Sequence, residues 1–201
     1  MGRLTLTAFL SLDGVMQAPG SPTEDSSGGF EHGGWLVPLI SAETGGVMLD
    51  VLSRAGAILI GRGTYDIFHR LGAEASNPVT ATLNRLPRYV ASRSQTDFSW
   101  PGTRAVDDAL GQLESIRAEV DGEIQVHGSH GLAQTLIEAN CIEEYRLFIC
   151  PVTLGLGKRL FDNLPVPGSL SLVGARSLAG GLLYSVYRPG ETFRTGSFSG
   201  G

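Results

Sequence analysis

The sequence predicts an α/β fold, in which helices pack on a largely parallel central sheet that an antiparallel ribbon completes. Strand-like and helix-like runs alternate over roughly the first two thirds of the 201 residues, which is typical of parallel sheets with helical crossovers. The last third holds strand-like runs with no helical run between them. Gly180-Gly181, between the last two runs, is typical of a hairpin turn. A chain of 21.2 kDa is the usual size of one domain.

Apolar runs bounded by turn residues indicate the strands. The clearest run is 57–60, Ala-Ile-Leu-Ile, which is continuously apolar and followed by glycine. The run 144–150 ends at Pro151 and a glycine-punctuated turn at 154–157. In chain order we predict strands at 4–9, 57–60, 88–91, 103–105, 123–126, 144–150, 169–177 and 181–187.

Helices are predicted between the parallel strands. The best supported is 106–119, because Ala109, Leu113, Ile116 and Val120 recur at a spacing near that of a helical turn. The predicted helices are 36–54, 64–70, 79–84, 106–119 and 132–139.

Two segments lie outside these elements. The connection 17–34 is rich in Gly, Pro, Ser and acidic residues, and a loop of that length is either a binding lid or simply disordered. We favour a lid, because the loop starts beyond the end of the first strand, where ligands of open α/β sheets gather. The tail 195–201 is mostly Gly and Ser and is predicted to be flexible, so the domain spans 1–194.

Composition narrows the classes of partner. Hydrophobic residues make up 42% of the chain, which is too many for a disordered protein. The formal charge of -5 argues against a nucleic-acid binder and favours a small-molecule ligand. The apolar run at 4–12 is too short and too broken for a signal peptide, and no segment has the length of a membrane span. We therefore expect a cytoplasmic location.

Cysteine and histidine usage does not indicate a metal centre or a nucleophile. Cys141 and Cys150 lie beside apolar or strand-like sequence, which favours buried free thiols. His127 and His130 have the spacing of a ligand pair, but no carboxylate or cysteine lies near them in the sequence, so we predict no metal site. Residues 128–131 lack the Gly-x-Ser-x-Gly spacing of a hydrolase elbow.

The most informative stretch is Gly61-Arg62-Gly63-Thr64, between the strand at 57–60 and the next predicted helix. A strand that gives way to a helix here leaves backbone N–H groups pointing at the space above the turn, which is how proteins bind anions. Arg62 adds a planar cation suited to phosphate, and Thr64 could cap the helix or donate its hydroxyl. Taken alone, the tetrapeptide is equally compatible with an ordinary turn.

Two further turns resemble it. Ser92-Arg93 follows the strand ending at residue 91, and Gly128-Ser129 follows the strand ending at residue 126. Three anion-competent turns on one sheet favour a dinucleotide site over coincidence. The usual Gly-x-Gly-x-x-Gly fingerprint is absent from the first strand-to-helix turn, so another dinucleotide fold is needed. Arginines at two separate turns suit an adenosine 2′-phosphate, and we therefore prefer NADPH over NADH.

These residues resemble the dihydrofolate-reductase-like superfamily and, within it, the RibD C-terminal domain group of riboflavin-biosynthesis reductases and their stand-alone relatives. Ser-Leu-Asp-Gly at 11–14 is similar to the group's opening motif, and 61–64 to the pyrophosphate turn of dihydrofolate reductases. The most specific match is the C-terminal signature, which comprises Val126-His127-Gly128-Ser129 through Leu136, Tyr145-Arg146-Leu147, Pro151-Val152, Leu154-Gly155-Leu156-Gly157 and Leu160-Phe161.

The resemblance implies a three-layer αβα fold, an NADPH-dependent reductase and often a homodimer. It also implies which residues bind. The cofactor-binding residues would be Gly61, Arg62, Gly63, Thr64, Ser92, Arg93, Gly128 and Ser129. Asp13 and Trp35 would stand near the nicotinamide and the substrate, with the 17–34 loop closing over both.

The protein mainly orients nicotinamide against substrate in such a reaction and supplies a proton. The candidate proton sources are Asp13 and Glu43, with His127 third and also a candidate substrate contact. Asp13 is equally well explained as a turn residue before Gly14.

The substrate stays open between several classes. The nearest is the 5-amino-6-(5-phosphoribosylamino)uracil of riboflavin biosynthesis, although His127 and 65–68 stand where those reductases carry acidic segments. A dihydrofolate or pteridine reductase is an alternative, with Ile40 near the position of the family's buried carboxylate. A non-catalytic NADPH-binding protein of the same fold is another.

Overall fold

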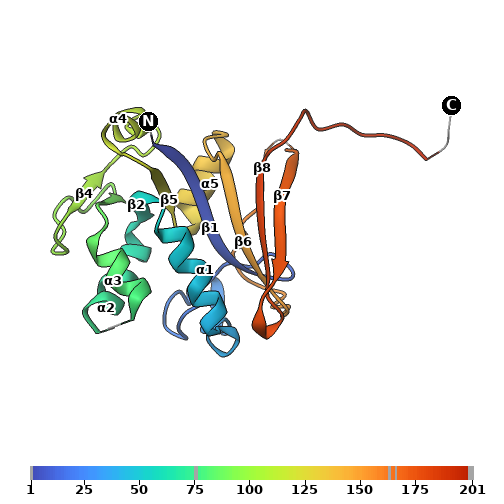
Figure 1. The fold of residues 1–201 in the computed structure, drawn as a ribbon, viewed down its shortest axis with the longest axis horizontal. Helices are drawn as coiled ribbons and strands as arrows, with labels where there is room; N and C mark the ends of the chain where they lie inside the picture. The colour runs from blue at the N-terminus through green and yellow to red at the C-terminus, as the bar shows by residue number, and fades with distance from the viewer. Residues whose placement is uncertain (1, 75–76, 163, 166, 199–201) are drawn as a thin grey trace.

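The sheet is the centre of the molecule and orders all other elements (Figure 1). The structure, a computed structural model, describes residues 2–74, 77–162, 164–165 and 167–198. Eight strands form one sheet in the order β4-β3-β2-β5-β1-β6-β8-β7. Pairing from β4 through to β6 is parallel, whereas β8 is antiparallel to both β6 and β7. The predicted parallel sheet with a C-terminal antiparallel ribbon is therefore confirmed.

The strand bounds agree with the predicted ones to within about two residues. The strands are β1 (Arg3–Ser11), β2 (Ala55–Gly61), β3 (Arg88–Ala91), β4 (Thr103–Val106), β5 (Glu123–Val126), β6 (Glu144–Cys150), β7 (Leu170–Ser177) and β8 (Leu183–Pro189). The last strand begins at Leu183 rather than 181, because Gly180 and Gly181 have φ of 79° and 77° and form the turn.

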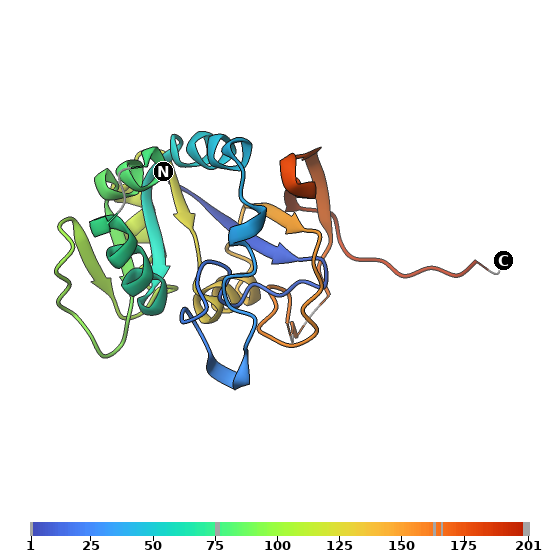
Figure 2. The same cartoon turned by 90° about the horizontal axis from the view of Figure 1, so that it is seen from below.

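Helices cover both faces, which makes three layers (Figure 2). The α-helices are α1 (Ala42–Leu52), α2 (Arg62–Glu74), α3 (Pro78–Arg85), α4 (Leu113–Glu119) and α5 (His130–Glu138). On one face, α4 and α5 pack on alternate residues of β1, including Leu4 and Leu6. On the other, α1 packs near Phe9 and Phe148, while α2 and α3 pack on β2 and β3. The αβα sandwich is confirmed.

The first predicted helix, 36–54, is wrong in its first turns. Residues Val37–Leu39 form a 3-10 helix that contains Pro38, and α1 starts only at Ala42. Ser41 is the N-cap of α1, because its hydroxyl accepts a hydrogen bond from the backbone N–H of Thr44 at 3.2 Å.

The predicted helix 106–119 is wrong in its first half. β4 extends to Val106, a turn follows, and α4 begins at Leu113. The Asp108 carboxylate accepts a hydrogen bond from the backbone N–H of Gly111 at 3.0 Å, which stabilises a turn in place of a helix. The apolar spacing at 109–120 was a helical signal only for its second half.

The second predicted helix, 64–70, is longer than expected at both ends. α2 begins at Arg62, directly after β2, so Thr64 lies within its first turn and is not its cap. The predicted four-residue turn is therefore a strand that passes into a helix without an intervening loop.

The 17–34 connection packs against the segment that follows β6. It contains only a short 3-10 helix, Ser27–Gly29, within the described residues. Phe30 is buried against Val15 and Ala18, and Lys158 forms an ion pair with Asp25 at 2.6 Å. In the predicted tail, 195–198 extend away from the sheet, and 199–201 lie outside the described residues.

Two expectations about the chain as a whole have a structural counterpart. Cys141 and Cys150 are both free and Cys150 is buried, but the expected burial of Cys141 is wrong, because it is only partly buried. Within the described residues, none of the helices has the length and apolar character needed to cross a membrane.

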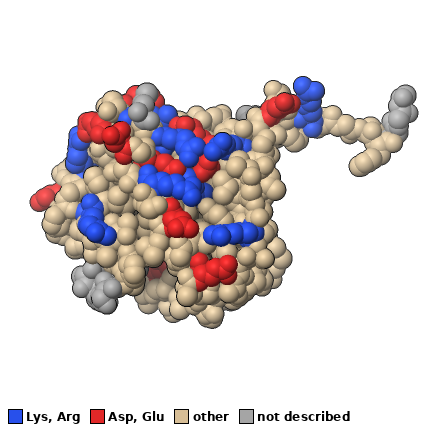
Figure 3. Space-filling view, viewed as in Figure 1, with Lys and Arg blue, Asp and Glu red and all other residues tan. Residues whose placement is uncertain are grey.

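A buried cluster of charges joins the three middle strands. The guanidinium of Arg146 on β6 is fully buried and donates to both carboxylate oxygens of Glu123 at 2.7 Å. It also pairs with Glu144 at 2.5 Å. Arg3 and Arg188 bind the outer side of the two carboxylates. On the face of the molecule seen in Figure 3, acidic and basic side chains are intermingled.

The charge cluster changes the acidity of its carboxylates. Burial by itself would raise the pKa of Glu123, but hydrogen bonds from Arg146, Gln125 and Arg3 outweigh that effect and lower the pKa from 4.5 to about 2. At Glu144, burial likewise would raise the pKa, but the hydrogen bonds from Arg146 and Arg188 outweigh burial and lower it. The carboxylates are therefore ionised in the folded protein.

Replacing Arg146 should destabilise the protein strongly. Arg146→Met keeps most of the side-chain volume but leaves two buried carboxylates without their central partner, which costs about 3–5 kcal/mol of unfolding free energy. The matched control, Arg104→Ala, removes an exposed ion pair with Glu119 and should cost about 0–1 kcal/mol. Urea unfolding measures both, and equal small losses would contradict a structural role for Arg146.

The same cluster predicts acid sensitivity. Because the pKa of Glu123 is lower in the folded protein than its ordinary 4.5, its contribution to stability is complete above that pH. The contribution declines as the pH falls from 4.5 toward 2. Glu123→Gln should flatten the unfolding free energy over this range, whereas Glu191→Gln, at an exposed position, should leave the profile unchanged. Urea unfolding at a series of pH values checks the difference.

Candidate active site

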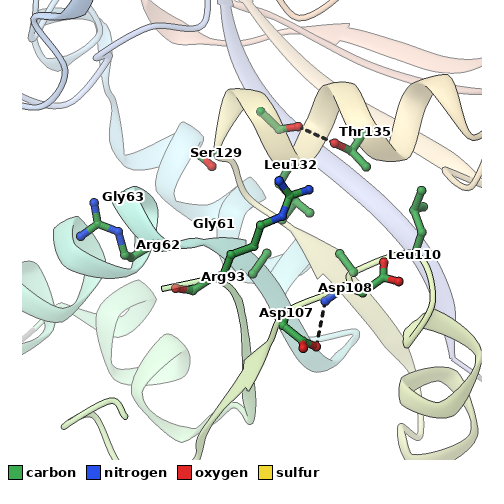
Figure 4. A pocket seen from close by; sticks show the side chains of 14 residues that line it. Gly61, Arg62, Gly63, Arg93, Asp107, Asp108, Leu110, Ser129, Leu132 and Thr135 are labelled. Carbon is green, nitrogen blue, oxygen red and sulfur yellow. Dashed lines mark hydrogen bonds between the residues drawn. The ribbon is translucent and has the colours of Figure 1, made fainter. Parts of the chain in front are cut away.

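An open pocket lies at the carboxyl ends of β2, β3, β4 and β5 (Figure 4). We call it the strand-end pocket, and its volume is about 640 Å³. Its lining residues are Gly61, Arg62, Gly63, Ala91, Ser92, Arg93, Asp107, Asp108, Ala109, Leu110, Ser129, Gly131, Leu132 and Thr135. The topology thus brings the three predicted turns together at one edge of the sheet.

Six of the predicted cofactor-binding residues line this pocket, and the other two lie next to it. Thr64 is buried, and a Cβ placed on Gly128 would come within 2.9 Å of its hydroxyl oxygen. At Gly61 a Cβ would lie 1.9 Å from Oγ of Ser129. Glycine is therefore needed at Gly61 to let β2 and the start of α5 approach each other.

Two helices start at the edge of the strand-end pocket. α2 begins at Arg62 and α5 at His130, so their first N–H groups have no partner within the helix. The positive end of each helix dipole adds to this effect. Backbone donors from two helices make the pocket suited to an anion.

The two arginines of the pocket differ in orientation. Arg93 extends across the pocket toward Ser129, Leu132 and Thr135 (Figure 4). Arg62 turns back along α2 and pairs with Asp66 at 3.3 Å, with about half of each side chain exposed. Arg93 is therefore positioned to meet a ligand in the pocket, while Arg62 must first leave a weak exposed ion pair.

The hydroxyl of Ser92, a predicted cofactor-binding residue, has a hydrogen-bond partner within the protein. Ser92 is buried, and its Oγ accepts a hydrogen bond from the backbone N–H of Gln95 at 3.0 Å. The hydroxyl of Ser92 keeps its own hydrogen as a donor.

Asp107 and Asp108 are pocket residues that the sequence interpretation missed. They were assigned to a helix, although Asp-Asp followed by Gly111 is also a signal for a turn. Each carboxylate accepts one backbone hydrogen bond, from Asp108 N–H and Gly111 N–H respectively. The strand-end pocket therefore offers guanidinium groups for phosphate oxygens and carboxylates for hydroxyl groups.

A second pocket was not predicted. It lies on the other side of the β5–α5 turn, between α1, α3 and the sheet, and its volume is about 290 Å³. We call it the apolar pocket. Its lining residues are Phe9, Leu36, Ile40, Thr44, Gly45, Met48, Leu52, Phe68, Asn77, Val79, Thr80, Leu83, Trp100 and His127. No sequence motif marks it, because its walls come from six separate parts of the chain.

One short segment contributes a lining residue to each pocket. His127 lines the apolar pocket and Ser129, two residues later, lines the strand-end pocket. Gly128, with φ of 98°, connects them through a cis peptide bond to Ser129.

His127 is linked to the buried charge cluster through Gln125. The Gln125 amide nitrogen donates to Val51 O at 2.6 Å and to Glu123 Oε2 at 2.8 Å. Both of these partners only accept, so the Gln125 oxygen faces Nε2 of His127, at 3.1 Å. Burial, with the positive charge of Arg146, lowers the pKa of His127 to about 4. The imidazole is therefore neutral at pH 7 and carries its hydrogen on Nε2.

Asp13 ties two loops together. Its carboxylate accepts hydrogen bonds from Ser11 Oγ at 2.7 Å, Leu154 N at 3.0 Å and Gly155 N at 2.8 Å, and Arg159 lies 3.4 Å away. The Ser11 hydrogen bond is the largest cause of a pKa lowered to about 2. An ionised carboxylate with these partners is an acceptor at neutral pH, which fits the turn interpretation better than that of a proton donor.

Glu43 and Trp35 also have partners outside the pockets. The Glu43 carboxylate accepts a hydrogen bond from the backbone N–H of Ala179 at 2.8 Å. The Trp35 indole donates to Gln17 O at 2.8 Å, which holds the start of the 17–34 connection. Among the residues predicted to donate a proton or contact substrate, His127 is the one that lines a pocket in the described chain.

A metal site has no support in the geometry of the described residues. Among them, no group of three or more His, Cys, Asp or Glu side chains is arranged to hold an ion.

Residues 3–184 match the model of the RibD C-terminal domain family. The chain belongs to this family. The match confirms the resemblance noted in the sequence, and it spans every residue that lines either pocket. The family is one of reductases, so an oxidoreductase of the riboflavin-pathway type is supported.

Two other proteins are similar to this chain in sequence or in structure. The chain is 27% identical over 143 residues to the uncharacterized protein YyaP of Bacillus subtilis strain 168, which covers 69% of this chain and 76% of YyaP. A protein provisionally assigned to riboflavin biosynthesis from Shewanella sp. PV-4 has a TM-score of 0.72 at 20% identity, covering 95% of this chain and all of that one.

A second similar structure belongs to a longer chain. RibD of Acinetobacter baumannii has a TM-score of 0.63 at 13% identity and covers 95% of this chain, which spans 59% of that protein. At these identities the likeness of the solved structures establishes the dihydrofolate-reductase-like fold.

Proposed function

We propose that this protein is an NADPH-dependent reductase of a small heterocyclic molecule. The observation that carries the proposal is that the turn at 127–129 supplies His127 to the apolar pocket and Ser129 to the strand-end pocket. A reductase of this kind needs a polar site for a dinucleotide beside an apolar site for the acceptor ring. Within riboflavin-type chemistry, the nearest known reaction is the reduction of 5-amino-6-(5-phosphoribosylamino)uracil.

The residues of the strand-end pocket fit a dinucleotide phosphate. Arg93 and Arg62 supply the guanidinium groups, the first turns of α2 and α5 supply backbone donors, and Gly61 permits the close approach of the chain. Asp107 and Asp108 are placed to accept hydrogen bonds from ribose hydroxyls. NADPH bound here would supply a hydride.

The protein's own part in catalysis is to hold the acceptor ring and to exclude water. The walls of the apolar pocket do both. The pocket offers no carboxylate among the described residues, because Ile40 lines it and Glu43 binds Ala179 instead. That arrangement disfavours the dihydrofolate alternative, in which a carboxylate would face the pterin. Consumption of NADPH with an acceptor separates the reductase from a non-catalytic binding protein.

The proposed setting is cytoplasmic, since two free thiols are typical of a reducing compartment. The proposed partners are small molecules and a second copy of the chain.

Cofactor binding should depend on Arg93 more than on Arg62. Arg93→Ala removes the guanidinium that crosses the pocket and should weaken NADPH binding about 10–100-fold, since charge-assisted hydrogen bonds contribute about 1.5–3 kcal/mol. Arg62→Ala should weaken it less, because Arg62 must leave Asp66 to bind. Fluorescence titration with NADPH measures the dissociation constants.

The matched control is Arg104→Ala, which changes an exposed arginine away from both pockets and should bind NADPH like wild type. Wild type should bind NADH more weakly than NADPH. Arg93→Ala should bind NADH and NADPH equally weakly. If wild type does not bind NADPH at micromolar concentration, the proposal is wrong. If wild type binds NADH as tightly as NADPH, the preference for NADPH is wrong. The carboxylates of Asp107 and Asp108 would then determine which cofactor binds.

We also propose that the homodimer forms through the β7–β8 ribbon. β7 is the edge strand of the sheet, and all eight of its residues are exposed. Leu172 and Val173 are 59% and 52% exposed beside a bulge in the pairing with β8. The ribbon projects beyond the helices (Figure 1). An open edge with exposed apolar side chains on it favours pairing with the same edge of a second copy about a two-fold axis.

Adding charge to this edge should separate the dimer. In sedimentation equilibrium, wild type should have twice the 21.2 kDa chain mass, and Leu172→Lys should shift the population to monomer. Leu156→Lys is the matched control, because Leu156 is 73% exposed but lies outside the ribbon. A monomeric wild type, or a Leu172→Lys variant that stays dimeric, would show that the ribbon is not the interface.

A further inference from the structure

The apolar pocket contains no formal charge. None of its described lining residues is Lys, Arg, Asp or Glu, and His127 is neutral at pH 7 because its pKa is about 4. Nine of the side chains are aliphatic, aromatic or thioether groups, and Phe9, Phe68 and Trp100 supply flat surfaces. At about 290 Å³ the pocket is at the small end of the range for ligand sites. It has room for one compact ring system.

Most polar groups in the pocket already serve the helices. Thr44 Oγ1 lies 3.1 Å from Oγ of its cap Ser41. The Asn77 side-chain oxygen accepts from the N–H and the hydroxyl of Thr80, as the N-cap of α3. These hydrogen bonds stabilise the starts of α1 and α3 and engage the side-chain oxygen of Asn77.

His127 is the exception. Its Nε2 donates to Gln125, which is held in turn by Val51 O and Glu123. The other ring nitrogen, Nδ1, must then be a hydrogen-bond acceptor, and no described residue donates to it. His127 therefore adds one hydrogen-bond acceptor to a pocket whose lining is mainly apolar.

We infer that the apolar pocket binds a flat, uncharged, unphosphorylated heterocycle whose ring N–H donates to Nδ1 of His127. A phosphate carried into this pocket would lose its water without meeting a cation, which is strongly unfavourable. The contrast with the strand-end pocket, where Arg62 and Arg93 lie, is direct. The inference rests on the proposed function only in taking this occupant to be the hydride acceptor. It assigns an acceptor without the phosphate that the phosphoribosyl compound carries.

Trp100 allows binding to be measured without cofactor. It lines the pocket, whereas Trp35, the other tryptophan, does not. Quenching of tryptophan fluorescence at pH 6 would be followed with lumazine, which is flat, uncharged and has ring N–H groups. Uridine and uridine 5′-monophosphate would be compared as a matched pair that differs only in the phosphate. Trp100→Phe assigns the quenching to this pocket, since the signal should then disappear.

Lumazine should quench Trp100, and the phosphate of uridine 5′-monophosphate should not tighten binding relative to uridine. A phosphate that tightens binding by about tenfold or more would reveal a cation in the site and overturn the inference. Absence of quenching by both lumazine and uridine at millimolar concentration would overturn it as well.

Substitutions at His127 test the acceptor. His127→Phe keeps a flat ring but loses Nδ1 and should weaken lumazine binding about tenfold, as for a lost buried hydrogen bond. His127→Asn keeps an acceptor near the position of Nδ1 and should recover part of the loss. His32→Phe, the same change at an exposed position outside both pockets, should bind like wild type. Equal binding by His127→Phe and wild type would contradict the assigned contact.

NADPH titration of the same samples separates this inference from the proposed function. Lumazine binding without NADPH binding would leave the pocket assignment intact and refute the reductase proposal. NADPH binding without lumazine or uridine binding would do the reverse.

Discussion

The buried guanidinium of Arg146 is the interaction on which the middle of this sheet depends. It joins Glu123 of β5 to Glu144 of β6, and Arg3 of β1 reaches the same two carboxylates from the strand between them. Charge therefore holds together the same three strands that backbone hydrogen bonds align. Gln125 extends the cluster to His127, where the positive charge of Arg146 helps to keep the imidazole neutral. An ion-pair cluster at the amino ends of the strands thus influences the site at their carboxyl ends.

Parallel order is the second constraint, because it gathers sequence-distant turns at one edge. The ends of β2, β3, β4 and β5 bring Gly61, Ser92, Asp107 and Ser129 to one pocket, and the absence of a side chain at Gly61 lets β2 approach the start of α5. The opposite wall of the β5–α5 turn faces α1 and α3, where the second pocket is apolar. One turn therefore separates a charged site from an uncharged one.

Much of the fold was predictable because its signals are local. The run 57–60 and the strands at 88–91, 123–126 and 144–150 lie where their apolar runs indicate. Local signals were not sufficient at 106–119, where only the second half of the predicted helix forms. The side-chain hydrogen bond of Asp108 stabilises a turn there, and this turn brings Asp107 and Asp108 to the pocket. The hydrogen bonds of Asp13 and Glu43 were not predictable either, because their backbone partners lie more than a hundred residues away in the sequence.

The sequence by itself determined the fold class, the family and the turns that gather at the strand ends, because periodicity and short motifs are carried by neighbouring residues. Tertiary structure decided what those motifs do. It turned Arg62 toward Asp66 and Arg93 into the pocket, and it built the apolar pocket from segments that share no motif. It also set the tautomer of His127 through Gln125. Side-chain orientation, burial and hydrogen-bond partners depend on residues distant in the chain, and these properties exist only once the chain has folded.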